Sequence, residues 1–484
     1  MHKTAFGVIF TQRHFNHIFS QEVKNMKKTL ILLLLLSIFA LYGKNPKYVF
    51  LFIGDGMATP QRMVADEFSR KIGKGQLAIN TLPFHATTRT NSGSSLVTDS
   101  AAAATAIACG EKTRNGRIGM DFEGKRKLES VAYVAQKNGK KVGIVTSVTI
   151  NHATPSGFYG TRPSRSQYYE LGLDLINSKF DYFGGGGIAK CDDKKSPLYK
   201  GNIYTLAAKE GYKVVKTRQE LMALKPGSGK VLASGSDAAL PYAIDKVKEV
   251  ATLAEFTAKG IELLDNPKGF FMMVEGGAID WCGHANEAAG NLFEVLAFDD
   301  AVRVALKFAE KHPEDTLIVV TGDHETGGMT MGFAGTGYAV YMDRLANQKC
   351  SLGEFAKKVK AAKKVNPKFA FEDAQKMLTD NFGFKFSGNK KQNPMVLTAQ
   401  EIKALKEAFD KDRLHSAARI IMNTKAGIGW TSGSHTALPV LTTAKGVKGE
   451  LFTGFIDNTD IAKKLKSVLT SQDSNEKSFW DFLF

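Results

Sequence analysis

A serine stands where a polar loop meets a run of alanines, in the segment VTDSAAAATA at residues 97–106. Four consecutive alanines favour an α-helix, and Asp99 or Ser100 directly before them is typical of a helix N-cap. A hydroxyl at that position faces free backbone N–H groups and the positive end of the helix dipole, which suits a phosphate or a developing oxyanion. Capping residues are far commoner than nucleophiles, so Ser100 becomes a candidate nucleophile only together with other segments.

Three other segments place carboxylates and histidines directly after apolar runs that are typical of buried strands. They are Asp55 after residues 48–53; Glu275, Asp280 and His284 after residues 270–274; and Asp323 and His324 after residues 316–321. Asp280 and His284 are spaced i, i+4, so a helical turn puts them on one face. Carboxylate and imidazole together are suitable zinc ligands. One such segment alone is better explained as a turn, but the three together predict a metal site.

Two more loops contribute candidates. His152 and Thr154 follow an apolar run at residues 141–147, in a loop shaped by Pro155. His435 lies in a loop of small residues before a strand that we expect at residues 438–442. In open α/β sheets, ligands bind beyond the carboxyl ends of the strands, which is where these side chains are expected.

The elements that must position these residues form an α/β pattern. The strand-like runs are continuously apolar, which is typical of a parallel sheet buried on both faces. An amphipathic helix is expected at residues 288–306, and a short strand at 180–183 ends in four glycines, which predict a tight turn at a sheet edge. The lysine-rich segment 351–417 has helical patterns and no catalytic grouping, so we expect an inserted helical subdomain there.

The N-terminus predicts a signal peptide. Lys27 and Lys28 form a basic region, residues 29–42 are apolar and leucine-rich, and Gly43 is a small residue before a cleavage site. The apolar run is shorter than the roughly 20 residues of a membrane-spanning helix. We therefore expect an exported protein, periplasmic or secreted, with no stable membrane span after processing; an uncleaved anchor is the alternative. The four cysteines are too scattered for a disulfide scaffold, but one disulfide is possible.

The composition is that of a globular protein: 43% of the 484 residues are hydrophobic and 23% are charged. The net charge of +17 is spread without a long Lys/Arg block, and no nucleic-acid-binding motif is present. The charge is therefore explained either by anionic small ligands or by surface solvation.

The motifs taken together resemble the alkaline phosphatase family. They occur in the family's order as IGDGM at 53–57, TDSAAAATA at 98–106, HATPS at 152–156, EGGAIDWCGH at 275–284, TGDHETGG at 321–328 and SGSHT at 432–436. The resemblance implies a phosphate monoester hydrolase with one catalytic domain at 44–484. It also implies a large, mostly parallel central sheet flanked by helices, and a homodimer.

The resemblance implies roles around the serine. Ser100 corresponds to the nucleophile that becomes phosphoserine. Arg165 corresponds to the arginine that grips the phosphate, with Arg162 as the rival candidate, and Asp99 to the residue that orients it. A related metal-dependent phosphodiesterase, phosphomutase or sulfatase is an alternative, although a sulfatase needs Cys/Ser-x-Pro-x-Arg where alanines follow Ser100. A second alternative is an exported anion-binding protein without catalysis.

The resemblance also implies two zinc ions and one magnesium ion per subunit. The expected ligands are Asp280, His284 and His435 for one zinc; Asp55, Asp323 and His324 for the other; and Asp55, Thr154 and Glu275 for magnesium. Two positions vary within the family, His152 and Trp281, and both are expected near the phosphate or the third metal.

Overall fold

The computed structural model describes residues 24, 26–28 and 45–470. The chain divides into two units, Met1–Asn45 and Pro46–Phe484. Residues 24 and 26–28 of the first unit are helical, whereas the apolar run and Gly43 of the predicted signal peptide lie outside the described residues. Within the described part of the chain, no helix has both the length and the apolar character that crossing a membrane requires.

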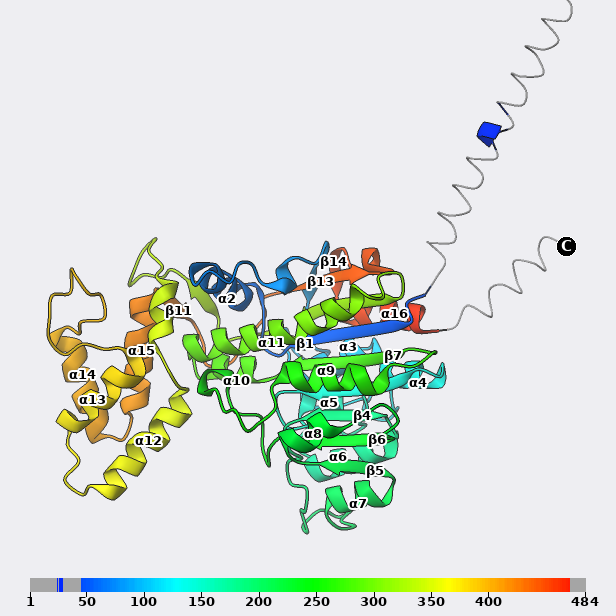
Figure 1. Cartoon of the computed structure of the whole chain (residues 1–484), viewed down its shortest axis with the longest axis horizontal. Coiled ribbons are helices and arrows are strands. Elements are labelled where there is room, and N and C mark those ends of the chain that lie inside the picture. The colour runs from blue at the N-terminus through cyan, green and yellow to red at the C-terminus, as the bar shows by residue number, and fades with distance from the viewer. Residues whose placement is uncertain (1–23, 25, 29–44, 471–484) are drawn as a thin grey trace, which may run out of the picture. The chain divides into compact units, whose positions relative to one another are not determined.

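A single ten-stranded sheet organises the second unit, in the order β14-β2-β13-β8-β1-β7-β3-β4-β6-β5 (Figure 1). Its strands are β1 (Tyr48–Gly54), β2 (Phe84–Arg89), β3 (Lys141–Thr146), β4 (Tyr182–Gly185), β5 (Tyr212–Val215), β6 (Lys230–Ser234), β7 (Phe270–Gly276), β8 (Thr316–Gly322), β13 (Val440–Gly446) and β14 (Gly454–Asp457). Only β13 runs antiparallel to its neighbours in this sheet. The predicted α/β fold with a mostly parallel central sheet is therefore confirmed.

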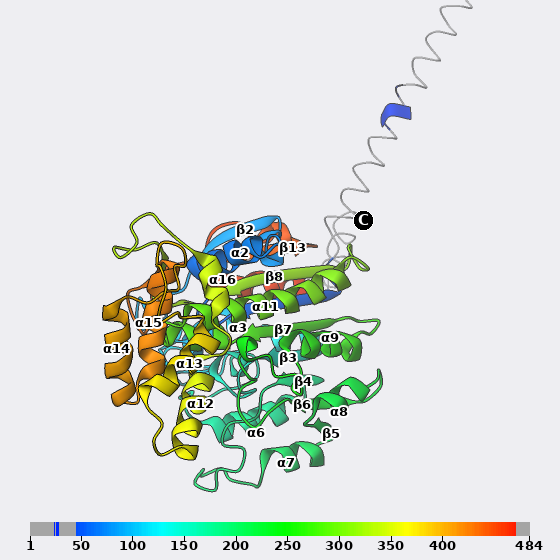
Figure 2. The same ribbon diagram turned by 60° about the vertical axis from the view of Figure 1, so that its left-hand side comes forward.

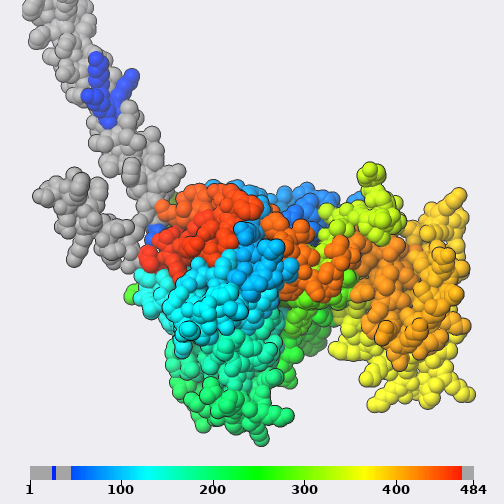
Figure 3. All heavy atoms as spheres, turned by 180° about the vertical axis from the view of Figure 1, so that it is seen from behind, coloured from blue at the N-terminus to red at the C-terminus, as the bar shows by residue number. Residues whose placement is uncertain are grey.

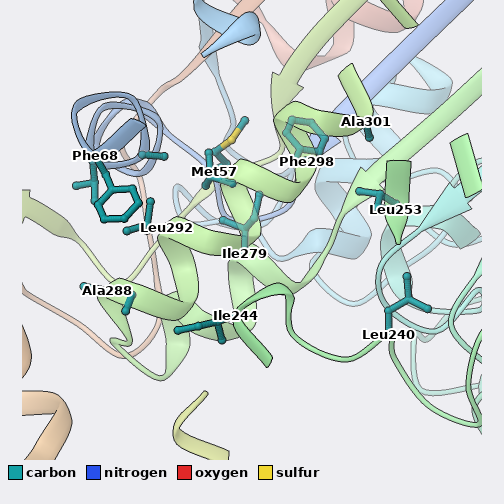
Figure 4. Packing of buried hydrophobic residues seen from close by; sticks show 14 of the residues in the cluster. Met57, Phe68, Leu240, Ile244, Leu253, Ile279, Ala288, Leu292, Phe298 and Ala301 are labelled. Carbon is teal, nitrogen blue, oxygen red and sulfur yellow. The ribbon is translucent and has the colours of Figure 1, made fainter. Parts of the chain in front are cut away.

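Helices cover both faces of the sheet. Alternate side chains of β1 enter two separate apolar clusters, Tyr48, Phe50 and Phe52 on one face and Val49, Leu51 and Ile53 on the other. The first face carries α2 (Thr59–Lys71), α9 (Leu253–Leu264) and α11 (Ala288–Ala309); the second carries α3 (Ser100–Cys109), α4 (Val131–Lys137), α6 (Tyr168–Ser178), α7 (Ile203–Lys209) and α16 (Asn458–Leu469). Figure 4 shows part of the first cluster, with Met57, Phe68, Leu292 and Phe298. Each large side chain buried in this way contributes roughly 1.5–3 kcal/mol, so the sheet is a rigid base for the loops at its edge.

The glycine run after residue 183 lies inside the sheet. Strand β4 has β3 and β6 as neighbours, so the expectation of a turn at a sheet edge is wrong. A Cβ on Gly185 would lie 2.1 Å from the carbonyl oxygen of Thr146, and one on Gly186 would lie 2.5 Å from that of Val148. The glycines are therefore required for close approach of the backbone to the end of β3.

The predicted helical insertion is confirmed and is longer than expected. It comprises α12 (Leu352–Val365), α13 (Phe371–Phe382), α14 (Ala399–Asp410) and α15 (Leu414–Ala426). The strands that bracket it, β10 (Met329–Met331) and β11 (Ile428–Trp430), pair antiparallel, so the chain returns beside the point where it left. The insertion forms a lobe at one end of the unit, yellow and orange in Figures 1, 2 and 3.

The four cysteines, Cys109, Cys191, Cys282 and Cys350, are all free, so the disulfide that the sequence left open is not formed. Burial raises the pKa of the Cys109 thiol to about 12. The thiol therefore stays neutral and packs as a small apolar group.

Candidate active site

The strands on either side of β1 pair with it in register, so their carboxyl ends meet at one level. Ile53 of β1 lies opposite Glu275 of β7 and Thr321 of β8. The residues that follow β1 and β8, Asp55 and Asp323, therefore leave the sheet side by side. This edge of a parallel sheet is where ligands bind in open α/β folds.

Helix α3 places the serine. The Asp99 carboxylate accepts a hydrogen bond from the Ala102 N–H at 3.0 Å, so Asp99 is the N-cap and Ser100 is the first helical residue. The Ser100 hydroxyl is therefore not used for capping. It is buried, and its Oγ lies 3.3 Å from Nε2 of His324. The simpler interpretation of this segment, a cap and nothing more, applies to Asp99 and leaves Ser100 directed at the carboxylates and histidines.

Three groups of side chains each bring potential ligand atoms within 4.8 Å of one another. The groups are Asp280, His284 and His435; Asp55, Asp323 and His324; and Asp55, His152 and Glu275. Thr154 lies beside the third group, where its Oγ1 donates to Oδ2 of Asp55 at 3.1 Å. The structure thus brings together every residue expected to bind metal, and adds His152.

In the first group, the Nε2 atoms of His284 and His435 face each other. Nδ1 of His284 donates to the Gly433 carbonyl, and Nδ1 of His435 donates to the Thr98 carbonyl, each at 2.8 Å. The two Nε2 atoms, left as acceptors, are 3.1 Å apart, and each lies 3.4 Å from a carboxylate oxygen of Asp280. Lone pairs that converge in this way, with the other ring nitrogen held by a carbonyl, are typical of a cation site.

In the other two groups, several buried ligand atoms have no hydrogen-bond partner among the described residues. They are Oδ1 of Asp55, Oδ2 of Asp323, Oε1 of Glu275 and Nδ1 of His152. Leaving a buried polar atom unsatisfied costs about 1–3 kcal/mol. The donors present fit divalent cations, which would satisfy these atoms.

Burial perturbs the titration of these groups. It raises the pKa of Glu275 and of Asp323 to about 7, and, together with the neighbouring carboxylates, raises that of Asp55 well above its ordinary value. Burial also lowers the pKa of His152 to about 4 and that of His324 well below its ordinary value. The imidazoles of His152 and His324 are therefore neutral at physiological pH and available as ligands.

The structure separates the two candidate arginines. Nη1 of Arg165 lies 3.0 Å from Oδ2 of Asp99, and its Nη2 lies 3.3 Å from Nε2 of His152. Arg162 is occupied elsewhere, because its Nε and Nη2 donate to both carboxylate oxygens of Asp174. Arg165 is therefore brought to the site, and Arg162 is not.

Thr326 connects the first two groups, although sequence analysis did not single it out. Its Oγ1 donates to Oδ1 of Asp280 at 2.5 Å and lies 3.3 Å from Nδ1 of His324. Its carbonyl accepts from Gln61, which also donates to the buried Glu325. Thr326 and Glu325 lie within the motif TGDHETGG, which was the only signal for them. The structure shows that Thr326 contacts two candidate ligands, Asp280 and His324, and that Glu325 bonds to Gln61 behind them.

The family model for alkaline phosphatase matches residues 46–471 of this chain. The chain belongs to the alkaline phosphatase family. Alkaline phosphatase 3 of Bacillus subtilis (strain 168) is 34% identical over 443 residues, which cover 87% of this chain and 89% of that relative. The resemblance of the motifs is thereby confirmed, and with it phosphate monoester hydrolysis and dependence on metal.

Solved structures of alkaline phosphatases have the same fold as this chain. The cold-active alkaline phosphatase of the psychrophile Shewanella sp. has a TM-score of 0.76 at 29% identity, over 88% of this chain and 100% of that chain. The Thermus thermophilus alkaline phosphatase has a TM-score of 0.75 at 25% identity, over 89% and 93% of the two chains. Because the chain belongs to the alkaline phosphatase family, the alternative of an anion-binding protein without catalysis is rejected.

The two variable positions of this phosphatase lie against each other. The rings of His152 and Trp281 meet edge to face, with centroids 6.0 Å apart. His152 is also in contact with Arg165, so the imidazole connects Trp281 with the arginine. Trp281 is half-buried, which leaves part of its ring available to a substrate.

Proposed function

We propose that this phosphatase acts through a phosphoserine at Ser100. The observation that carries the proposal is the position of Ser100 Oγ, 3.3 Å from Nε2 of His324, which is itself 3.3 Å from carboxylate oxygens of Asp55 and Asp323. A hydroxyl beside a group that can hold a cation is placed for activation as a nucleophile.

We assign two zinc ions and one magnesium ion to the three groups. Imidazole and carboxylate donors favour zinc at Asp280, His284 and His435, and at Asp55, Asp323 and His324. The oxygens of Asp55, Thr154 and Glu275 favour magnesium, with His152 beside them. When bound, such cations stabilise negative charge on the phosphoryl group and favour deprotonation of the attacking hydroxyl.

The chain's own residues bind and transfer the phosphoryl group. The Arg165 guanidinium donates to two phosphate oxygens, a bidentate geometry held by Asp99. Ser100 Oγ, having lost its proton to solvent, attacks phosphorus in line; the bond from phosphorus to the alcohol oxygen breaks, and the alcohol leaves. Water then attacks the phosphoserine, the bond to Oγ breaks, and inorganic phosphate is released. Two in-line attacks retain configuration at phosphorus.

We further propose that residues 1–43 direct export and are removed, leaving residues 44–484 as the catalytic domain of a periplasmic or secreted homodimer. The basic and apolar regions of the N-terminus support export. Sequencing of the mature N-terminus and light scattering of the purified protein test the two statements; a mature chain that begins at residue 1 would contradict the first.

The experiment that tests the activity compares an aryl phosphate, a phosphodiester and a sulfate ester, with and without a chelator. We expect the monoester to be preferred, with activity lost on chelation and restored by zinc and magnesium. Metal analysis counts the ions per chain. Equal rates on the diester, or monoester hydrolysis that survives full chelation, would contradict the proposal.

Rebinding of metal to the chelated protein is expected to weaken below about pH 7, because Glu275 and Asp323, whose pKa burial raises to about 7, then hold protons that a cation must displace. Each displaced proton lowers the apparent affinity about tenfold per pH unit. Calorimetric titrations across this range measure the slope.

The same raised pKa values determine whether the stability of the metal-free protein rises or falls with pH. Between about pH 4 and about pH 7 the folded state holds protons that the unfolded state has lost, so stability falls as pH rises through this window. Comparing the chelated wild type with a chelated Glu275→Gln variant separates this effect from that of His152 and His324, whose lowered pKa values act in the opposite direction. The melting temperature of the wild type relative to that of the variant should fall as pH rises through this window. A relative melting temperature that rises would contradict the raised pKa of Glu275.

Replacing His152 with aspartate is expected to raise magnesium affinity about tenfold, because a hard anionic oxygen replaces a neutral imidazole beside Asp55 and Glu275. Structures of the alkaline phosphatase from the Antarctic bacterium TAB5, with a histidine replaced by aspartate or glutamate, hold magnesium in its M3 site. We infer that His152 is comparable. Calorimetry of the zinc-loaded variant measures the effect, with the exposed His85→Asp as control; unchanged affinity would contradict the placement of the third site.

A further inference from the structure

A cavity of about 640 Å³ lies between the helical insertion and the main body of the unit. It is lined by residues 238–242 together with Thr149 and Trp281, and by the segment that leads into α12 and its first turns. This volume is within the range of about 300–1,000 Å³ that is typical of small-molecule sites.

The cavity adjoins the residues that we assign to phosphate binding. Trp281, which lines it, packs against His152, and His152 Nε2 lies 3.3 Å from Nη2 of Arg165. Thr149, also in the wall, accepts a hydrogen bond from the His152 N–H through its carbonyl at 2.8 Å. Trp281 belongs to α10 (Ala278–His284), which also carries Asp280. The cavity is therefore linked to Arg165 through the contacts of Trp281 and His152.

The two acidic residues in the lining, Asp245 and Glu354, both have polar partners. Both carboxylate oxygens of Asp245 accept hydrogen bonds from Ser351, from its N–H at 2.7 Å and its hydroxyl at 2.8 Å. Glu354 pairs with Lys357 at 3.7 Å. Asp245 keeps its negative charge, because both Ser351 donors are neutral, whereas the charge of Glu354 is paired with Lys357.

Two lysines in the lining have hydrogen-bond acceptors that are uncharged. Lys349 Nζ donates to the Ala346 carbonyl at 2.6 Å, and Lys358 Nζ donates to the side-chain carbonyl of Asn381 at 3.2 Å. Both acceptors are uncharged, and no ion pair within residues 45–470 includes either lysine. Each ammonium retains protons for a second acceptor. The lining therefore carries a net positive charge, with Lys349, Lys357 and Lys358 against Asp245 and Glu354, in a cavity that Trp281 also lines.

We propose that this cavity is a leaving-group subsite, selective for phosphate monoesters whose alcohol carries a second anionic group, such as another phosphate. The proposal rests on the assignment of Arg165 and Ser100 to the phosphate that reacts. The alcohol portion lies along Trp281, and Lys349 and Lys358 bind its anion. Preference among substrates is thus set by the insertion, while the phosphoryl transfer itself depends on residues at the end of the sheet.

The test compares a hexose bisphosphate with the corresponding hexose monophosphate, and uses the Lys349→Ala/Lys358→Ala double variant. We expect kcat/KM for the bisphosphate to fall roughly tenfold, because two partly exposed charge pairs are lost. The monophosphate should change less than about twofold, and the difference should vanish near 1 M salt, where exposed charges are screened. Ratios of variant to wild type remove the statistical advantage of two phosphates.

Lys360→Ala is the matched control, because Lys360 is exposed on the same helix but lines a different cavity beside Phe409. It should leave both substrates unaffected, and a Lys349→Arg/Lys358→Arg variant should retain the preference. Equal losses on both substrates, or none on the bisphosphate, would overturn the subsite. Failure of the catalytic assignment would instead appear as aryl phosphate hydrolysis that survives replacement of Ser100, so the two proposals are separable.

Discussion

Replacing Ser100 with alanine is expected to lower kcat/KM for an aryl phosphate by roughly 10⁴-fold, because the loss of a nucleophile removes the covalent route. The fold should be unaffected. Asp99 remains as the N-cap of α3, and only one buried oxygen, 3.3 Å from Nε2 of His324, is removed. Alanine is also a better helix former than serine.

Steady-state kinetics on the zinc- and magnesium-loaded variant measure the loss. Mass spectrometry after acid quenching should find one phosphoryl group on the peptide that contains Ser100 in the wild type and none in the variant. Ser95→Ala, at an exposed position in the same loop, is the control and should keep full activity. A variant of Ser100 that retains most of its activity would exclude the phosphoserine.

Replacing Asp323 with asparagine is expected to abolish most activity and to move stability in opposite directions with and without metal. One carboxylate oxygen of Asp323 accepts from the Gly56 N–H at 3.0 Å. The other has no hydrogen-bond partner within residues 45–470 and lies 3.3 Å from Nε2 of His324. The amide keeps the volume and the first bond but loses the charge. Zinc affinity should fall by at least about 100-fold, since even indirect ligand contacts are worth 10–100-fold.

The stability of the metal-free protein should rise in the same variant. At about pH 8 the wild type buries several carboxylates that repel one another and whose pKa values are raised by burial. Removing one charge relieves that repulsion, so the melting temperature of the chelated variant should exceed that of the chelated wild type. With metals present the order should reverse, because the wild type gains more from binding.

Thermal unfolding in chelator and in saturating zinc measures both changes in melting temperature. Asp300→Asn, an exposed carboxylate on α11, is the control and should shift both melting temperatures equally. A chelated Asp323→Asn protein that is less stable than the chelated wild type would contradict the view that a cation balances these carboxylates.

Much of the fold was predictable because the hydrophobicity of a short segment indicates whether that segment is buried. The run at residues 48–53 is apolar at every position, which is typical of a strand covered on both faces, and β1 is that strand. The helical pattern at residues 352–365 likewise matches α12. Strand β2 was not predicted, because alternate positions are exposed and its residues, FHATTR, are as polar as those of a loop.

The chemistry of the candidate site could also be predicted from local sequence, because the residue types stand at strand ends. The geometry of the site could not be predicted in this way. Sequence alone marked both Arg162 and Arg165; the choice came from Asp174, which holds Arg162, and from Asp99, which holds Arg165. Those partners are set by how α3 and α6 pack, and no local pattern reports it.

The sequence by itself determined the residue types, their order and the strands that carry them, because hydrophobic periodicity and motif composition depend on near neighbours. Tertiary structure alone decided which side chains meet. The register of β1 with β7 and β8 aligns Asp55, Glu275 and Asp323, and the pairing of β9 (Glu325–Thr326) with β12 (His435–Thr436) brings His435 beside Thr326. Likewise, the path of the insertion places two lysines in a cavity that Trp281 also lines. These are long-range contacts, whose partners are selected by the packing of the whole sheet and its covering helices.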